Sequence, residues 1–190
     1  MAGGKSRRMG GQDKAFVLLN KKPMLSHVID RLNKQTKNIV LNSNKNPEVF
    51  KSFKIKVMSD TVKDFPGPLA GVLSGMEWFN IENKKIKWVL SVPIDSPFFP
   101  LDLIKKLHFS LKNSNKLIAV AKSNKKIHPV FALWNMSLLN PIKNAINNDI
   151  RKIDLFTEPY QPQIVDFVSK IDPFFNINTP EDLKMAEKYF

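Results

Sequence analysis

The sequence contains no cysteine and is short of glycine and acidic residues. Without cysteine, the 190-residue chain has no disulfide scaffold, no thiolate nucleophile and no cysteine-ligated zinc or iron–sulfur site. No apolar run approaches the roughly 20 residues of a membrane-spanning helix, and the basic N-terminal stretch lacks the apolar core of a secretory signal. With 43% hydrophobic and 25% charged residues the composition is globular, and we expect a cytoplasmic protein.

Acidic residues are outnumbered by basic ones, 17 against 30, which gives a net charge of +13. Such a charge attracts nucleic acid, acidic lipid or phosphorylated small molecules. The lysines are spread along the whole chain, so a merely solvated basic surface explains the charge equally well. The 14 phenylalanines lie mostly in apolar periodic segments and are more simply core than a stacking platform for bases. We therefore expect neither a nucleic-acid partner nor a membrane partner.

Glycine is scarce: there are 7, whereas average usage gives about 13. Four of them (Gly3, Gly4, Gly10 and Gly11) lie in the first eleven residues, among lysines and arginines. Glycines let backbone N–H groups form a concavity for anions, and the cations add charge for a polyphosphate. The spacing matches neither the P-loop nor the dinucleotide fingerprint. The alternative is a flexible basic tail.

Strand-like and helix-like segments alternate along the chain. Apolar runs predict strands at 38–42, 54–60, 88–94, 116–121, 130–134 and 164–168. Helical spacing predicts helices at 23–32, 100–111, 137–146 and 179–189. The turn PGPLAG (66–71) leads into a further helix with Val72, Met76 and Phe79 on one face. The order indicates an α/β fold, a doubly wound, mostly parallel sheet with helices on both faces, in a single domain over 1–190.

Polar residues stand just after three of the predicted strands: Asn42, Asp60 and Asp95. Ligands of open α/β sheets bind at the carboxyl ends of strands, so we expect these residues to converge on one crevice. Asp95 is the best candidate for a magnesium ligand, because Mg²⁺ prefers one or two carboxylates plus phosphate oxygens. The alternative for Asp95 is a turn before Pro97, and Asn42 and Asp60 could merely cap strand ends. The three histidines lack metal-ligand spacing, and none is expected to act as a base.

Seven segments, in order along the chain, resemble the molybdenum cofactor guanylyltransferases of the sugar-nucleotidyltransferase-like superfamily. They are AGGKSRRMGGQDKAF (2–16), KPMLSHVIDRL (22–32), VLNSN (40–44), SDTVKDFPGPLAG (59–71), VPIDSPFFP (92–100), HPVFALW (128–134) and NINTPEDL (176–183). The glycine-rich loop alone would indicate only a nucleotidyltransferase. GPLAG and NINTPEDL favour the guanylyl branch over the cytidylyl relatives.

The resemblance implies an enzyme that joins GMP from GTP to the phosphate of the molybdenum-bound pterin and releases pyrophosphate, with Mg²⁺ as cofactor. It implies GTP and molybdenum–molybdopterin as substrates, and transient contact with proteins that supply the cofactor or mature molybdoenzymes. Residues 1–100 would form the GTP-binding half and 101–190 the acceptor half. Two alternatives stay open: a related transferase with another nucleotide or acceptor, and a non-catalytic anion- or RNA-binding protein on the same fold.

The resemblance also implies roles for individual residues. Lys14, Arg8 and Asp95 would carry catalysis, with Asp95 holding the metal. The other contacts would be Ala2 and Gly3 to GTP, Gly4 and Gly11 to the triphosphate, Asn42 and Asp60 to the nucleoside, and Arg151, Asn176 and Asn178 to the pterin. Whether Asp60 meets the base or the ribose stays open. The attacking group is an ionised phosphate, so no general base is required, and catalysis consists of positioning and charge stabilisation.

The sequence departs from the family at its beginning. The family's glycine loop follows an apolar first strand that ends in Leu-Ala-Gly-Gly, and here Met1 stands in place of that leucine. The first strand is central in doubly wound sheets, so we expect a slot between its two neighbours. We interpret this as a start that lies further upstream, the alternative being a truncated, inactive chain.

Overall fold

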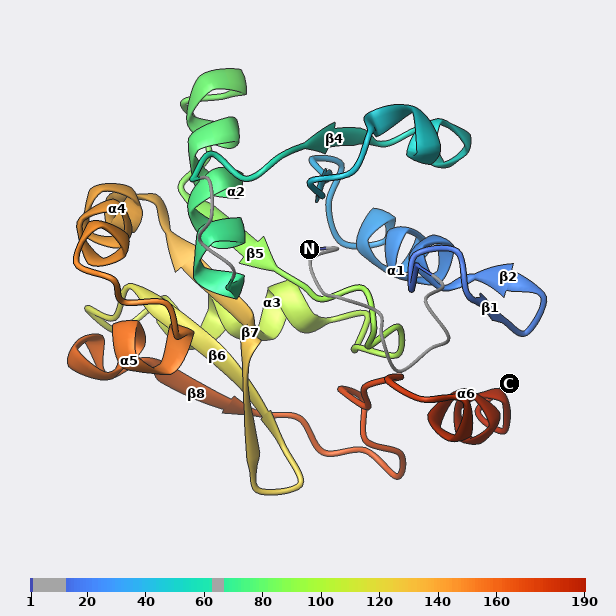
Figure 1. Ribbon diagram of the computed structural model, residues 1–190. Helices are drawn as coiled ribbons and strands as arrows, with labels where there is room; N and C mark the ends of the chain where they lie inside the picture. Colours follow the sequence, from blue (N-terminus) through green and yellow to red (C-terminus); the bar gives the residue numbers. More distant parts are fainter. Residues whose placement is uncertain (2–12, 63–66) are drawn as a thin grey trace.

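A computed structural model of the chain describes residues 1, 13–62 and 67–190. Helices pack around a central group of strands (Figure 1). The α/β fold expected from the alternating pattern is confirmed. Within the described ranges, no helix is long and apolar enough to cross a membrane.

The N-terminal elements begin with a short hairpin. Strands β1 (Leu18–Leu19) and β2 (Lys22–Pro23) pair antiparallel across Asn20 and Lys21, which both have positive φ, 47° and 62°. Two consecutive residues of this kind form the turn whose twist suits a two-residue hairpin. Helix α1 (Met24–Asn33) follows directly and buries Met24, Leu25 and Val28.

The next unit is a parallel pair of strands followed by a buried helix. Strand β3 (Val40–Asn42) pairs with β4 (Lys56–Met58), and the 3-10 helix η2 (Pro47–Phe53) connects them. Helix α2 (Pro68–Glu82) starts with proline in its first turn. Most of its first three turns is buried, so α2 is a core helix rather than an amphipathic surface one.

The larger sheet has the strand order β5-β7-β6-β8. Its members are β5 (Trp88–Ser91), β6 (Ile118–Ser123), β7 (Lys126–Asn135) and β8 (Gln163–Asp166). The pairing is mixed: β8 is parallel to β6, whereas β7 is antiparallel to both neighbours because a two-residue turn joins it to β6. The remaining elements are α3 (Leu103–Leu111), η3 (Met136–Leu138), α4 (Leu139–Asn147), α5 (Ile153–Thr157), η4 (Glu158–Tyr160) and α6 (Pro180–Glu187).

Both faces of this sheet are covered by helices. Ile118 and Val120 of β6 belong to a core cluster with residues of α2, α4 and α5. Ala119 and Ala121 point the other way and belong to a second cluster with α3. Alternate residues of a strand face opposite sides of a sheet, so the helices lie on both faces, as expected.

An apolar cavity of about 270 Å³ lies between β3 and β5 and is lined by both strands, α1, α2 and Met1. The Met1 amino group donates to the Val92 carbonyl at 2.9 Å, and the Met1 carbonyl accepts from the Ile94 N–H at 3.3 Å. Burial lowers the pKa of this amino group to about 6, although Asp95 and Asp60 raise it. In the part of the chain that the structure describes, no strand pairs with the edges of β3 and β5 that border this cavity.

Candidate active site

Lys14, Asp95 and Asn178 form the centre of the site. Lys14 Nζ donates to Asp95 Oδ2 at 2.8 Å and to Asn178 Oδ1 at 2.5 Å. The Lys14 and Asp95 side chains are only 19% and 22% exposed, so solvent and salt screen this ion pair less than a surface pair. Residues from both halves of the chain therefore meet at one ammonium group.

Asp95 is held in place by buried neighbours on both sides. It follows β5 and stands between Ile94 and Ser96, which are 6% and 0% exposed. The Asp95 carbonyl accepts from the Ile177 N–H at 2.7 Å, and the Ser96 hydroxyl donates to the Asn176 side chain. These bonds fasten the segment before α6 to the loop after β5.

The start of α6 fixes Asn178. Thr179 and Asp182 form a capping box, and Asp182 Oδ2 accepts from the Thr179 N–H at 3.0 Å and the Asn178 N–H at 2.9 Å. Proline at the first helical position and the acidic first turn explain why a helix begins here. The cap thus holds the backbone that presents Asn178 to Lys14.

A second cluster surrounds Asp60, where β3 and β4 end. Asn42 Nδ2 donates to Asp60 Oδ1 at 2.8 Å, and Asn44 Nδ2 donates to Asp60 Oδ2 at 2.7 Å. Asn42 is 6% exposed. A methyl group at Gly71 of α2 would lie 2.6 Å from Met1 Cε and 2.8 Å from Asn42 Oδ1, so glycine there lets both side chains pack closely against α2. The structure brings Asn42 and Asp60 together, as the strand ends predicted.

Two contacts link the clusters. Lys45, in the loop after β3, pairs with Asp13 Oδ2 at 2.7 Å, next to Lys14. The Met1 amino group lies close enough to Asp95 and Asp60 for both to raise its pKa. Asp60 of one cluster and Asp95 of the other are therefore both within electrostatic range of the Met1 amino group.

The donor set around Asp95 fits a magnesium ion. No group of three or more His, Asp or Glu side chains that could hold a metal exists among residues 1, 13–62 and 67–190. Asp95 uses Oδ2 for Lys14, and within those same ranges Oδ1 accepts no hydrogen bond. One carboxylate oxygen completed by phosphate oxygens and water is the mode in which Mg²⁺ binds at phosphate-transfer sites.

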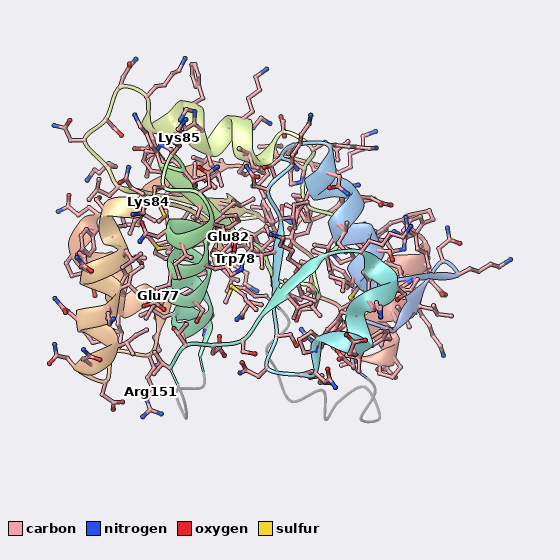
Figure 2. All side chains as sticks on the ribbon, turned by 90° about the horizontal axis from the view of Figure 1, so that it is seen from above. Glu77, Trp78, Glu82, Lys84, Lys85 and Arg151 are labelled. Atoms are coloured by element: carbon pink, nitrogen blue, oxygen red, sulfur yellow. The ribbon has the colours of Figure 1, made fainter. Side chains whose placement is uncertain are left out.

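The other predicted residues fall into two groups. Ala2, Gly3, Gly4, Arg8 and Gly11 lie outside the described residues. Arg151 lies where α2 begins, opposite the end that carries Glu82, Lys84 and Lys85 (Figure 2). Its guanidinium pairs with Asp149 at 2.8 Å, and its carbonyl oxygen packs against Gly67.

Sequence reasoning missed Asn44, Ser96 and Asp182, although all three belong to these clusters. Asp182 carried a signal, because its place in the capping pattern was recognised. Asn44 lies two positions after Asn42 in the segment VLNSN and could have been weighed for the same reason.

Comparison with known proteins identifies the family of the chain. The model of the MobA-like NTP transferase domain matches residues 1–159. A molybdenum cofactor guanylyltransferase of Rhodopseudomonas palustris (strain BisB5) is 44% identical over 190 residues, covering 99% of this chain and 90% of the relative. One of Haemophilus influenzae (strain 86-028NP) is 38% identical over 184 residues, with 97% and 93% covered.

Two solved structures show the same fold. Molybdopterin-guanine dinucleotide biosynthesis protein A of Archaeoglobus fulgidus superposes with a TM-score of 0.72 at 24% identity, over 99% of this chain and 95% of that one. 4-Diphosphocytidyl-2C-methyl-D-erythritol synthase of Anaerococcus prevotii gives 0.75 at 14% identity, over 99% and 92%. At these identities the likeness concerns the fold.

Proposed function

The chain belongs to the MobA-like NTP transferase family and is a nucleotidyltransferase, and we propose that it transfers GMP from GTP to the phosphate of molybdenum-bound molybdopterin. The names of relatives that are 38–44% identical over nearly the whole chain support these substrates. The observation that carries the proposal is the contact of Lys14 with Asp95 and Asn178 at the carboxyl end of β5. We propose that the reaction takes place in the cytoplasm.

Lys14 would bind the phosphates of the nucleotide. In the transfer, an oxygen of the acceptor phosphate forms a bond to the α-phosphorus while the bond from that phosphorus to the pyrophosphate oxygen breaks. Negative charge then builds on the departing pyrophosphate, and a fixed ammonium group stabilises it. Asp95 and Asn178 hold Lys14 in place for this task, and no proton has to be moved by the protein.

Asp95 would hold Mg²⁺ through its carboxylate. When bound, the ion supplies positive charge to phosphate oxygens and orients them. The binding of an ion at Oδ1 is compatible with the Lys14 contact at Oδ2. Among residues 1, 13–62 and 67–190, no cluster of three or more His, Asp or Glu side chains offers another site.

Asn42 and Asp60 would recognise the nucleoside. The Asp60 carboxylate accepts one amide bond on each oxygen, and each oxygen has capacity for one more. Two adjacent acceptors suit a pair of adjacent donors, such as guanine N1–H with the 2-amino group, or the two ribose hydroxyls. Adenine has no such pair on its edge.

The acceptor would approach from the side formed by residues 101–190. Asn176 and Asn178 lie at the boundary between the halves, one bonded to Ser96 and the other to Lys14. An acceptor phosphate must reach the α-phosphorus in line with the leaving pyrophosphate, so this boundary is where we propose that the pterin phosphate enters.

Isothermal titration with GTP, ATP and CTP in the presence of Mg²⁺ tests the proposal. We expect GTP to bind at least about tenfold more tightly than either competitor, and Lys14→Ala to weaken GTP binding by about tenfold or more. Lys22→Ala is the matched control, because Lys22 forms an exposed ion pair with Asp30 on α1. Equal affinity for the three nucleotides, or equal effects of both lysine variants, would contradict the proposal.

A further inference from the structure

Asn44 forms two hydrogen bonds with Asp60, one through each polar atom of its side-chain amide. Asn44 Nδ2 donates to Asp60 Oδ2 at 2.7 Å, and Asn44 Oδ1 accepts from the Asp60 backbone N–H at 2.7 Å. The two bonds close a ring between the side chains and the backbone. The Asp60 carboxylate therefore cannot rotate without breaking a hydrogen bond to a charged group, one of the stronger kinds in proteins.

The backbone next to Asp60 is fixed from the opposite side. The Thr61 N–H donates to Ser74 Oγ at 2.9 Å, and Ser74 in turn donates to the Ala70 carbonyl of α2 at 2.9 Å. Ser74 is 1% exposed. The 60–61 peptide is thus anchored to the core through α2, which leaves the Asp60 side chain as the part that Asn44 has to orient.

Asn42 and Asn44 each donate to a different oxygen of the Asp60 carboxylate. Asn42 bonds Oδ1 and Asn44 bonds Oδ2, so each Asp60 oxygen uses one of its two lone pairs. One acceptor position per oxygen therefore remains for a ligand. Because Asn44 is exposed whereas Asn42 is buried, Asn44 belongs to the outer wall of the site rather than to the core.

We propose that Asn44 is a positioning residue for nucleoside recognition, acting through the Asp60 carboxylate. The inference rests on the proposed function, since it takes a nucleotide with two adjacent donors to be the ligand. Asn44 does not itself contact the nucleotide. It helps to hold both Asp60 oxygens in one orientation for two donors, and its loss leaves the carboxylate held by Asn42 alone.

The test compares Asn44→Ala with Asn46→Ala in equilibrium binding of GTP and in the kinetics of GMP transfer. Asn46 is an exposed asparagine two positions along the same loop, where its Oδ1 accepts from the Glu48 N–H and caps the η2 helix. Among the described residues it forms no hydrogen bond with Asn42, Asn44 or Asp60. We expect Asn44→Ala to raise the Kd and KM for GTP about tenfold while kcat changes less than about threefold. Asn46→Ala should leave all three within about twofold.

The same comparison in an Asp60→Ala background identifies the route. If Asn44 acts through Asp60, Asn44→Ala should change the Kd for GTP less than about twofold once Asp60 is gone. An undiminished tenfold loss in that background would overturn the inference, because Asn44 would then act directly. An Asn44→Ala protein that binds GTP as the unchanged protein does would overturn it as well.

Two further outcomes separate the inference from the proposed function. Failure of the unchanged protein to bind GTP would overturn the proposed function, and with it the role of Asn44. Two analogues distinguish the two donor pairs: ITP lacks the 2-amino group of the base, and 2′-deoxy-GTP lacks one ribose hydroxyl. The analogue that loses a contact with Asp60 should bind the unchanged protein more weakly than GTP does. In Asn44→Ala, the ratio of the Kd of that analogue to the Kd of GTP should be smaller. If the Kd ratios of both analogues to GTP were the same in Asn44→Ala as in the unchanged protein, the inference would be contradicted.

Discussion

Lys14 and Asp95 form an ion pair of 2.8 Å although 81 positions separate them in the sequence. The pair joins the end of the glycine-rich N-terminal segment to the carboxyl end of β5. The negative charge of Asp95 pairs with Lys14, and in the proposed mechanism it would also bind a cation. Replacing the carboxylate by an amide of the same shape removes that charge alone.

Asp95→Asn should therefore raise the Mg²⁺ concentration for half-maximal activity by about tenfold or more and lower kcat/KM about a hundredfold. A magnesium titration of pyrophosphate release measures both effects. Asp30→Asn, in the exposed pair with Lys22, is the control and should change neither. An Asp95→Asn enzyme with the normal magnesium dependence would show that the metal is held elsewhere.

Gly71 and Gly75 offer a matched pair on helix α2. A methyl group at Gly75 meets Met58 Cε at 3.5 Å, an ordinary contact, so Gly75→Ala should raise the free energy of unfolding by about 0.5–1 kcal/mol. A methyl group at Gly71 would lie 2.6 Å from Met1 Cε and 2.8 Å from Asn42 Oδ1, and it should displace both side chains. We expect Gly71→Ala to weaken GTP binding about tenfold.

Urea denaturation and isothermal titration distinguish the two glycine variants. If both alanines stabilised the protein and neither changed GTP binding, the packing of Asn42 against α2 would not matter for the site.

The capping box of α6 couples helix stability to the site. Thr179→Ala removes one cap bond and should cost about 1 kcal/mol of stability with little change in kcat. Asp182→Ala removes the acceptor of the Asn178 N–H as well, so it should lower kcat about tenfold in addition. Steady-state kinetics measures kcat and thermal denaturation measures the stability of each variant. Equal kcat values in Thr179→Ala and Asp182→Ala would refute the link to Asn178.

His128 makes stability depend on pH. It is buried in β7, bonds Ser123 at 2.8 Å, and burial lowers its pKa below the ordinary 6.5, with Asp172 raising it and Lys126 lowering it. As the pH falls below about 6.5, the unfolded chain binds the proton before the folded chain does, so folding stability decreases. Glutamine at position 128 cannot take up this proton. The unfolding free energy of His128→Gln should therefore change less between about pH 7 and about pH 5 than that of the unchanged protein. Urea denaturation at the two pH values measures this. An equal fall in unfolding free energy in the unchanged protein and in His128→Gln would contradict this origin.

Much of the fold could be predicted from local patterns. Apolar periodicity placed a helix at 23–32, and α1 spans Met24–Asn33; the carboxyl ends of three strands predicted where Asn42, Asp60 and Asp95 would lie. Element ends were less accurate: the helix expected at 100–111 begins at Leu103, and the strand expected at 54–60 is only Lys56–Met58.

Other features depend on contacts that no local pattern carries. The hairpin turns at Asn20–Lys21 and Asn124–Lys125 have positive φ at both residues without any glycine, so their usual signal is absent. The strand expected at 130–134 extends over Lys126–Asn135, so that His128 and Pro129 lie within β7. Lys14 meets Asn178 across 164 positions, a proximity that only the packed chain reveals.

Transfer of labelled GMP from GTP to molybdenum–molybdopterin tests the central claim most directly. The test variants are Asp95→Ala and Lys14→Ala, and the controls are Asp30→Ala and Lys22→Ala in the exposed ion pair. We predict transfer by the unchanged protein, transfer within about twofold in the exposed-pair variants, and a loss of about a hundredfold or more in Asp95→Ala and Lys14→Ala. Turnover within a few-fold of normal in the last two would contradict the assignment of this cluster as the active site.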